Sequence, residues 1–128
     1  METLIICAMI AALLPYLAKA PLAFAMNKES GYDNNYPREQ QARLTGFGAR
    51  ASAAHYNSFE SLIIFSLAIA LVLATGSVDK TVERLAMIYV AARVTYCLMY
   101  YFDQDKLRSL VWFVGLAAPL AMMWQCLP

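Results

Sequence analysis

Four long apolar blocks constrain the fold of this chain more than any other feature of its sequence. They run from about Leu4 to Met26, Phe59 to Thr75, Leu85 to Phe102 and Leu110 to Leu127. A membrane-spanning helix needs roughly 20 mainly apolar residues, and as few as about 17 can suffice. Because lipid offers the backbone no hydrogen-bond partners, and the blocks do not alternate as barrel strands do, each block should be helical. The sequence therefore predicts an all-α integral membrane protein that spans the membrane with a four-helix bundle.

The composition agrees with this prediction and excludes several other classes. Hydrophobic residues make up 61% of the chain, whereas a soluble domain has about 45–50%. The 128 residues allow one domain, 1–128, with helices expected at about 3–26, 45–75, 82–102 and 107–127. The net charge of +1 and the absence of a basic run give no indication of nucleic-acid binding. One histidine and three widely separated cysteines predict neither a metal site nor a disulfide framework.

The connections between the blocks carry their own signals. Gly31 to Pro37 has turn chemistry and should end the first helix. From about Arg38 to Arg43 the sequence is helical again, so the second helix is expected to start outside the membrane. Ala23-Phe24-Ala25 resembles a signal-peptide cleavage site, but no positive residue precedes the first block, which favours a retained helix.

Basic residues are distributed unevenly between the two ends of the predicted bundle. The first and third connections carry Lys28, Arg38, Arg43, Arg50, Lys106 and Arg108, whereas the opposite side carries Lys80 and Arg84. The positive-inside rule then places the first and third connections in the cytoplasm and both termini on the non-cytoplasmic side. Without a retention signal or a removed targeting segment, a bacterial inner membrane is the expected location.

Three charged residues lie inside the apolar blocks: Lys19, Glu60 and Arg93. Lys19 lies near a helix end and can extend to the membrane interface, whereas Glu60 and Arg93 lie deeper. A charged side chain near the centre of a membrane helix costs about 2.5–3.5 kcal/mol, so each needs a partner or a wet cavity. Counting helical rise from the cytoplasmic side puts Glu60 and Arg93 at matching depths, each about 13 Å along its helix. We hypothesise that Glu60 and Arg93 face each other, within one subunit or across two.

Helical spacing extends these two charges into polar stripes. The stripes comprise Arg50, Asn57 and Glu60 on the second helix, Arg93, Tyr96 and Tyr100 on the third, and Arg108 and Ser109 at the start of the fourth. Because residues three, four and seven apart share a helix face, all three stripes should converge near one membrane interface. Such a cluster can hold helices together, or it can form a functional site, and both interpretations remain open.

The motifs that form the stripes are similar to those of a known family. Arg50-Ala51-Ser52-Ala53-Ala54-His55-Tyr56-Asn57-Ser58-Phe59-Glu60 resembles the second-helix signature of the MAPEG family, the membrane-associated proteins in eicosanoid and glutathione metabolism. Ala92-Arg93-Val94-Thr95-Tyr96, then Tyr100, then Leu107-Arg108-Ser109, resembles the family's third helix and the start of its fourth. The resemblance covers nearly the whole chain, and the plain motif set is similar to that of bacterial members.

This resemblance implies a homotrimer of MAPEG-like four-helix bundles that binds glutathione between subunits near the cytoplasmic face. By motif position, the glutathione-binding residues would be Arg50, Asn57, Glu60, Arg93, Tyr96 and Tyr100. Arg108 and Ser109 would be catalytic, near the glutathione sulfur. Ala53 and Tyr56 stand where characterised members often carry arginine, and Tyr96 where some carry histidine. Fewer cations predict weaker capture of the two glutathione carboxylates.

Two functions from different classes follow from this. The first is a glutathione-dependent transferase or peroxidase, in which Arg108 stabilises the thiolate that attacks a lipophilic small molecule. The second is a non-catalytic membrane protein that binds lipid or acts as a scaffold. A proton or ion pathway is a weaker third interpretation, because one Glu–Arg pair does not make a relay.

Overall fold

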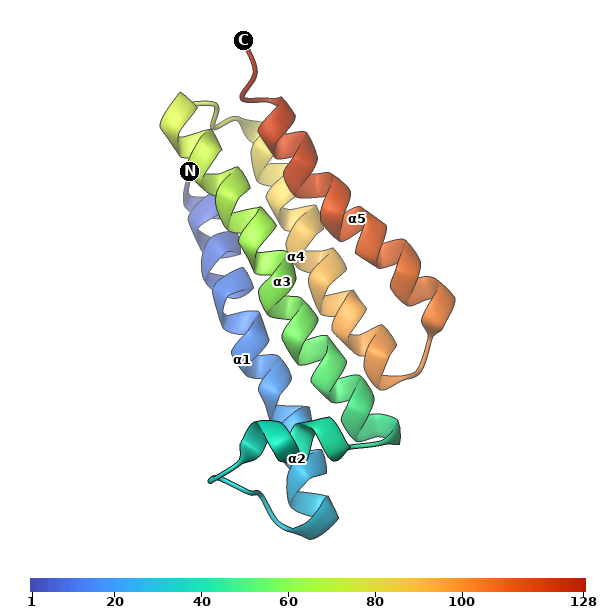
Figure 1. The fold of residues 1–128 in the computed structure, drawn as a ribbon. Helices are drawn as coiled ribbons and strands as arrows, with labels where there is room; N and C mark the ends of the chain where they lie inside the picture. Colours follow the sequence, from blue (N-terminus) through green and yellow to red (C-terminus); the bar gives the residue numbers. More distant parts are fainter.

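The computed structural model describes all of residues 1–128, and every regular element in it is a helix (Figure 1). The helices are α1 (Glu2–Ser30), α2 (Pro37–Arg43), α3 (Gly46–Thr75), α4 (Lys80–Tyr101) and α5 (Asp105–Trp124). The all-α prediction is therefore confirmed. The predicted number of helices was one too small, because the segment from Pro37 to Arg43 forms a helix of its own.

The four long helices lie side by side, and α2 crosses one end of them (Figure 1). The α4–α5 turn lies at this same end, which we call the α2 end, whereas both termini lie at the opposite end. α4 packs against α1, α3 and α5, so it shares a face with every other long helix. This arrangement brings the beginning of α3, the end of α4 and the beginning of α5 together at the α2 end.

Local chemistry sets the ends of the central helices. Gly76 ends α3 in the left-handed conformation, with φ +69°, which glycine adopts without steric cost. Asp79 caps α4, since its carboxylate accepts a hydrogen bond of 2.7 Å from the backbone N–H of Val82. Asp103 follows α4 with φ +59° and turns the chain toward α5. The short turns force α3, α4 and α5 to pack as antiparallel neighbours.

Three helices are long and apolar enough to cross a membrane: α1, α3 and α5. α4 has 22 residues but is not among them, because arginines and tyrosines lower its hydropathy. The sequence predicted four spans, and length and apolar composition support three of them. In the middle of α4, however, Tyr89, Arg93 and Tyr96 are buried among the other helices.

The interior of the bundle is built largely from small side chains. The main cluster joins residues of all four long helices, among them Ala11, Ala68, Ala86 and Ala118, around Phe65 stacked on Tyr89 at 3.9 Å. Small residues let helix backbones approach closely, and helix association within lipid depends on such packing. The main cluster contains no charged residue, so the charged part of the interior lies outside it.

The connection between α1 and α3 is held by two buried glutamines. The Gln40 side-chain amide donates to the carbonyls of Met26 and Gly31, and its oxygen accepts from the Asp33 N–H. Gln41 accepts a 2.6 Å hydrogen bond from the Tyr56 hydroxyl. The sequence predicted helix from Arg38 to Arg43, but as the outer part of the second helix. Extended backbone at Leu44 separates it from α3 instead.

Candidate functional site

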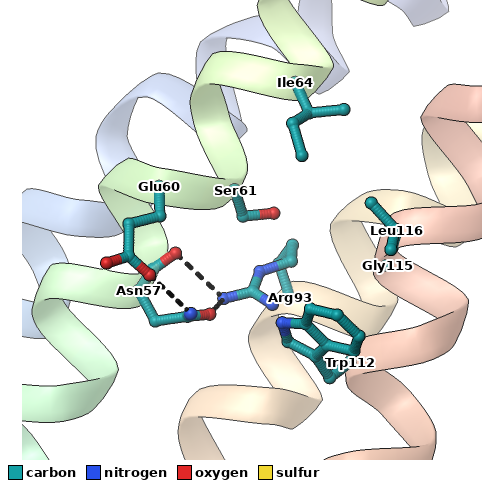
Figure 2. Close-up of a pocket in the computed structure, with 8 residues that line it drawn as sticks. All are labelled: Asn57, Glu60, Ser61, Ile64, Arg93, Trp112, Gly115 and Leu116. Carbon is teal, nitrogen blue, oxygen red and sulfur yellow. Dashed lines mark hydrogen bonds between the residues drawn. The ribbon is translucent and has the colours of Figure 1, made fainter.

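Arg93 lies at the centre of the site, on the buried face of α4 (Figure 2). Its side chain is only 2% exposed. One terminal nitrogen donates to the Asn57 side-chain oxygen at 2.6 Å and to the Asn57 backbone carbonyl at 3.4 Å. The Nε atom is buried and has no hydrogen-bond partner. A buried, charged donor without a partner is unusual. The Arg93 guanidinium therefore has hydrogen-bonding capacity that the chain itself does not use.

Asn57 connects Arg93 to Glu60. While its oxygen accepts from Arg93, its amide nitrogen donates to the Glu60 carboxylate at 2.9 Å (Figure 2). Glu60 and Arg93 line the same pocket, as the hypothesis of facing residues requires, but they form no direct ion pair within the subunit. Both polar atoms of the Asn57 side chain are hydrogen-bonded, one to each charged group, and Asn57 therefore bridges Glu60 and Arg93. The Glu60 side chain itself remains exposed, at the midpoint of α3.

A pocket of about 140 Å³ opens beside this chain of contacts. It is lined by Asn57, Glu60, Ser61 and Ile64 of α3, Arg93 of α4, and Trp112, Gly115 and Leu116 of α5. A Cβ atom at Gly115 would lie 3.2 Å from the Arg93 Cδ, so glycine there leaves room for the arginine. Sequence reasoning missed Gly115, Trp112 and Leu116, because nothing in an apolar helix indicates which face lines a pocket.

Two tyrosines of α4 separate two guanidinium groups. Arg93 lies over the Tyr96 ring at 4.2 Å, and Arg108 lies over the Tyr100 ring at 4.4 Å. The two rings meet edge to face, with centroids 5.2 Å apart. Each cation therefore rests on the electron-rich face of a ring, an arrangement that strengthens when water is excluded. The predicted stripe of Arg93, Tyr96 and Tyr100 is thus one connected group in space.

Arg108 is the least satisfied of these cations. It is half-buried at the start of α5, and its side chain forms no hydrogen bond and no ion pair within the chain. Ser109, its neighbour in the sequence, is exposed and donates to the Asp105 carbonyl at 3.1 Å. The Ser109 hydroxyl forms no hydrogen bond with any other predicted site residue. Of the two predicted catalytic residues, Arg108 contacts the tyrosine group, and the Ser109 hydroxyl is bonded to its own helix.

Arg50 reaches the same group from α3. Its Nε donates to the Tyr100 carbonyl at 3.1 Å and lies 3.8 Å from the Asp103 carboxylate. Asn57, Glu60, Arg93, Tyr96, Tyr100, Arg108 and Arg50 thus form one continuous set of contacts across three helices. The set contains three guanidinium groups and one carboxylate, Glu60, and a second carboxylate, Asp103, contacts it through Arg50.

The arrangement is suited to binding an anion. The excess of cations over carboxylates gives the site a positive potential, and low-dielectric surroundings strengthen it. The planar guanidinium group of arginine presents its N–H donors in a geometry that matches the two oxygens of a carboxylate. No group of three or more histidine, cysteine, aspartate or glutamate residues is close enough together to hold a metal ion.

These features define a class of protein: a helical integral membrane protein with a site between its helices that is lined by arginine and tyrosine residues. The family model described as the MAPEG family matches residues 3–128, essentially the whole chain. The chain belongs to the MAPEG family, and the family resemblance inferred from its motifs is confirmed. No curated protein and no solved structure matches the chain.

Proposed function

We propose that this protein is a glutathione-dependent transferase or peroxidase that acts on lipophilic electrophiles within the membrane. The observation that carries the proposal is Arg108, a guanidinium held over Tyr100 with no hydrogen-bond or ion-pair partner in the chain. Membership of the MAPEG family supports a glutathione-related function. The rest of the site adds two further arginines and the Asn57–Glu60 pair within the same contact group.

The chemistry needs a thiolate, since the thiol itself is a poor nucleophile. A thiol with a pKa of about 8.5 is only a few per cent ionised near neutral pH. Lowering that pKa by two units requires about 2.7 kcal/mol. A charge-assisted hydrogen bond from Arg108, shielded from bulk water, supplies stabilisation of that order. The thiol proton leaves to solvent. In the transferase reaction the sulfur lone pair forms a bond to the electrophilic carbon as the leaving group departs with its electron pair. In the peroxidase reaction the sulfur attacks a peroxide oxygen, the O–O bond breaks, and the alkoxide takes up a proton; a second glutathione thiol then converts the sulfenic acid to the disulfide and releases water.

Glutathione would be held by its carboxylates and amide groups at the remaining residues. The residues proposed to bind it are Asn57, Glu60, Arg93, Tyr96 and Tyr100. Arg50, which the motif resemblance also implies as a ligand, contacts the Tyr100 carbonyl and the Asp103 carboxylate instead. The pocket beside Arg93 measures about 140 Å³, which is room for one end of the tripeptide rather than all of it. The other end would extend past Glu60, whose side chain lines the pocket and is exposed.

The exposed position of Glu60 also bears on assembly. A carboxylate facing lipid from the middle of a helix costs about 2.5–3.5 kcal/mol. We propose that a neighbouring copy covers it in a homotrimer of four-span subunits, with glutathione between neighbours. We further propose that the α2 end, which carries most of the basic residues, lies in the cytoplasm and both termini outside, and that the membrane is a bacterial inner membrane.

The test is a calorimetric titration of the detergent-purified protein with glutathione, with Arg108→Ala in parallel. We expect the wild type to bind glutathione with a Kd in the micromolar-to-millimolar range. In Arg108→Ala, the thiol of bound glutathione should ionise at a higher pH than in the wild type. Arg43→Gln, an exposed change on α2, is the matched loss of one arginine and should bind as the wild type does. A well-folded wild type that binds no glutathione would rule this function out.

A non-catalytic lipid-binding protein or scaffold is the second candidate, and apolar grooves along α1 favour it. One of about 340 Å³ lies between α1 and α3, lined only by apolar residues such as Leu4, Met9 and Ile69. Another of about 320 Å³ lies between α1 and α4. This candidate predicts lipid retained through purification and no turnover of glutathione with any electrophile, which mass spectrometry and an electrophile screen would separate from the first.

A further inference from the structure

Arg50 makes contacts that differ in kind from those of the other arginines. Arg93 and Arg108 each lie on a tyrosine ring, but Arg50 contacts backbone and a turn residue. Its Nε donates to the Tyr100 carbonyl at 3.1 Å and lies 3.8 Å from the Asp103 carboxylate. The hydrogen bond joins α3 to the end of α4, and the ion pair joins α3 to the α4–α5 turn.

The turn that Arg50 contacts carries the reactive arginine of the proposed site. The last carbonyls of a helix lack partners within it, and Arg50 satisfies that of Tyr100 together with the Asp103 N–H. Asp103 adopts φ +59°, a left-handed conformation that few residues other than glycine, asparagine and aspartate adopt. Gln104 then accepts from the Arg108 N–H at 2.9 Å, which connects the turn directly to the first turn of α5.

We infer that Arg50 is a positioning residue: it fixes the α4–α5 turn, and so holds Arg108 against Tyr100, instead of binding glutathione itself. The inference rests on the proposed function for its chemical consequence. Its structural part, the fixed turn, stands independently of any ligand. The Arg50 side chain is 29% exposed and Asp103 is 68% exposed, so the ion pair alone is weak and the hydrogen bond to Tyr100 carries more of the restraint.

Two ligands separate positioning from direct binding. S-methylglutathione has the carboxylates of glutathione but no thiol, so its affinity reports carboxylate contacts alone. With Arg50→Gln, we expect its Kd to stay within about threefold of the wild type, since one lost charge-assisted carboxylate contact costs more than that. The pKa of the bound glutathione thiol, followed by thiolate absorbance against pH, should rise by about one unit, a tenfold change in ionisation.

Matched variants test the route of the effect. Arg50→Lys keeps a donor for the Tyr100 carbonyl and should restore most of the thiol ionisation. Asp103→Asn should raise the thiol pKa less than Arg50→Gln, and the double variant should add little, because both act on one turn. Arg43→Gln removes an exposed arginine from the same end of the molecule and should change neither readout. S-methylglutathione binding that weakens tenfold or more with Arg50→Gln would overturn the inference and make Arg50 a ligand.

Hydrogen exchange tests the turn without any ligand. Amides from Phe102 to Arg108 should exchange at least about tenfold faster in Arg50→Gln than in the wild type, because local opening becomes easier. Amides in the main core, such as Phe65, should be unchanged, as should the turn in Arg43→Gln. If the wild type binds no glutathione, the proposed function fails while exchange still decides whether Arg50 fixes the turn. An unchanged turn in Arg50→Gln would refute the inference even if glutathione binds.

Discussion

The Arg93 guanidinium is almost fully enclosed, yet no carboxylate touches it. The cost of removing this charge from water is offset by three features: the Asn57 side chain, the Tyr96 ring, and the more distant Glu60 carboxylate. Asn57 is central because its side chain is the only one that forms hydrogen bonds with both the Arg93 guanidinium and the Glu60 carboxylate. Asn57, which the motif resemblance implies as a glutathione ligand, is therefore also needed to stabilise the buried Arg93 guanidinium.

Replacing Asn57 by Leu should destabilise the protein. The change removes a hydrogen bond to a charged group and leaves a buried guanidinium with a weaker set of partners, which together cost about 1.5–3 kcal/mol. Thermal unfolding in detergent, followed by circular dichroism, measures the loss. Ser66→Leu is a matched polar-to-leucine change at an exposed position of the same helix and should leave the unfolding temperature nearly unchanged. Equal losses in both variants would contradict this account.

At the scale of elements, α2 is too short to be stable alone, because isolated helices under about 12 residues are marginal in water. Its two buried glutamines compensate by attaching it to α1 and α3. Gln40 alone satisfies three backbone groups of the α1–α2 connection. The position of α2 across the end of the bundle thus depends on polar side chains rather than on an apolar core.

Gln40→Leu should release this connection while leaving the bundle intact. Three backbone groups lose their partner, and each unpaired group that stays shielded from water costs about 1–3 kcal/mol, so the segment should open locally to hydrate them. Limited proteolysis should then cut between Gly31 and Leu44 much faster than in the wild type. Glu39→Gln, an exposed neighbour in the same helix, provides the control. Unaltered cleavage in Gln40→Leu would show that apolar contacts hold α2.

At the scale of the whole molecule, polarity is distributed along the bundle. The large apolar cluster occupies the half nearer the termini, around Phe65 and Tyr89, whereas the arginine–tyrosine group lies toward the α2 end. Both termini share one end, and the first residue contacts the beginning of α4, since the Met1 amino group pairs with Glu83. An asymmetric bundle of this kind should have a preferred direction in a membrane, and the positive-inside rule predicts that its basic end lies in the cytoplasm.

This direction can be measured by labelling introduced cysteines with a membrane-impermeant reagent in intact cells. We expect Ser77→Cys, in the α3–α4 turn, to react from outside, and Asn34→Cys, in the α1–α2 connection, to react only after the membrane is permeabilised. Both changes belong in a Cys126→Ser background, because Cys126 is partly exposed whereas Cys7 and Cys97 are buried. The reverse pattern would invert the orientation, and labelling of both sites from outside would contradict a spanning bundle.

The sequence alone determined the long helices, the shared face of the α4 polar residues and the family. The apolar blocks predicted the long helices, because backbone groups in lipid must bond within their own segment. Spacing of three and four residues predicted that Arg93, Tyr96 and Tyr100 share a face, and the structure places them in contact. The motif resemblance predicted the family, which the match over residues 3–128 confirms.

Only the tertiary structure decided which side chains meet across helices. Periodicity gives the face of a residue but not the rotation of one helix against another, so Asn57, rather than Glu60, contacts Arg93 directly. The tertiary structure also bonded the Ser109 hydroxyl to its own helix, placed Gly115 against Arg93, and separated α2 from α3 at Leu44. The role inferred for Arg50 arose in the same way, because its partner is a backbone carbonyl on another helix, which no sequence pattern records.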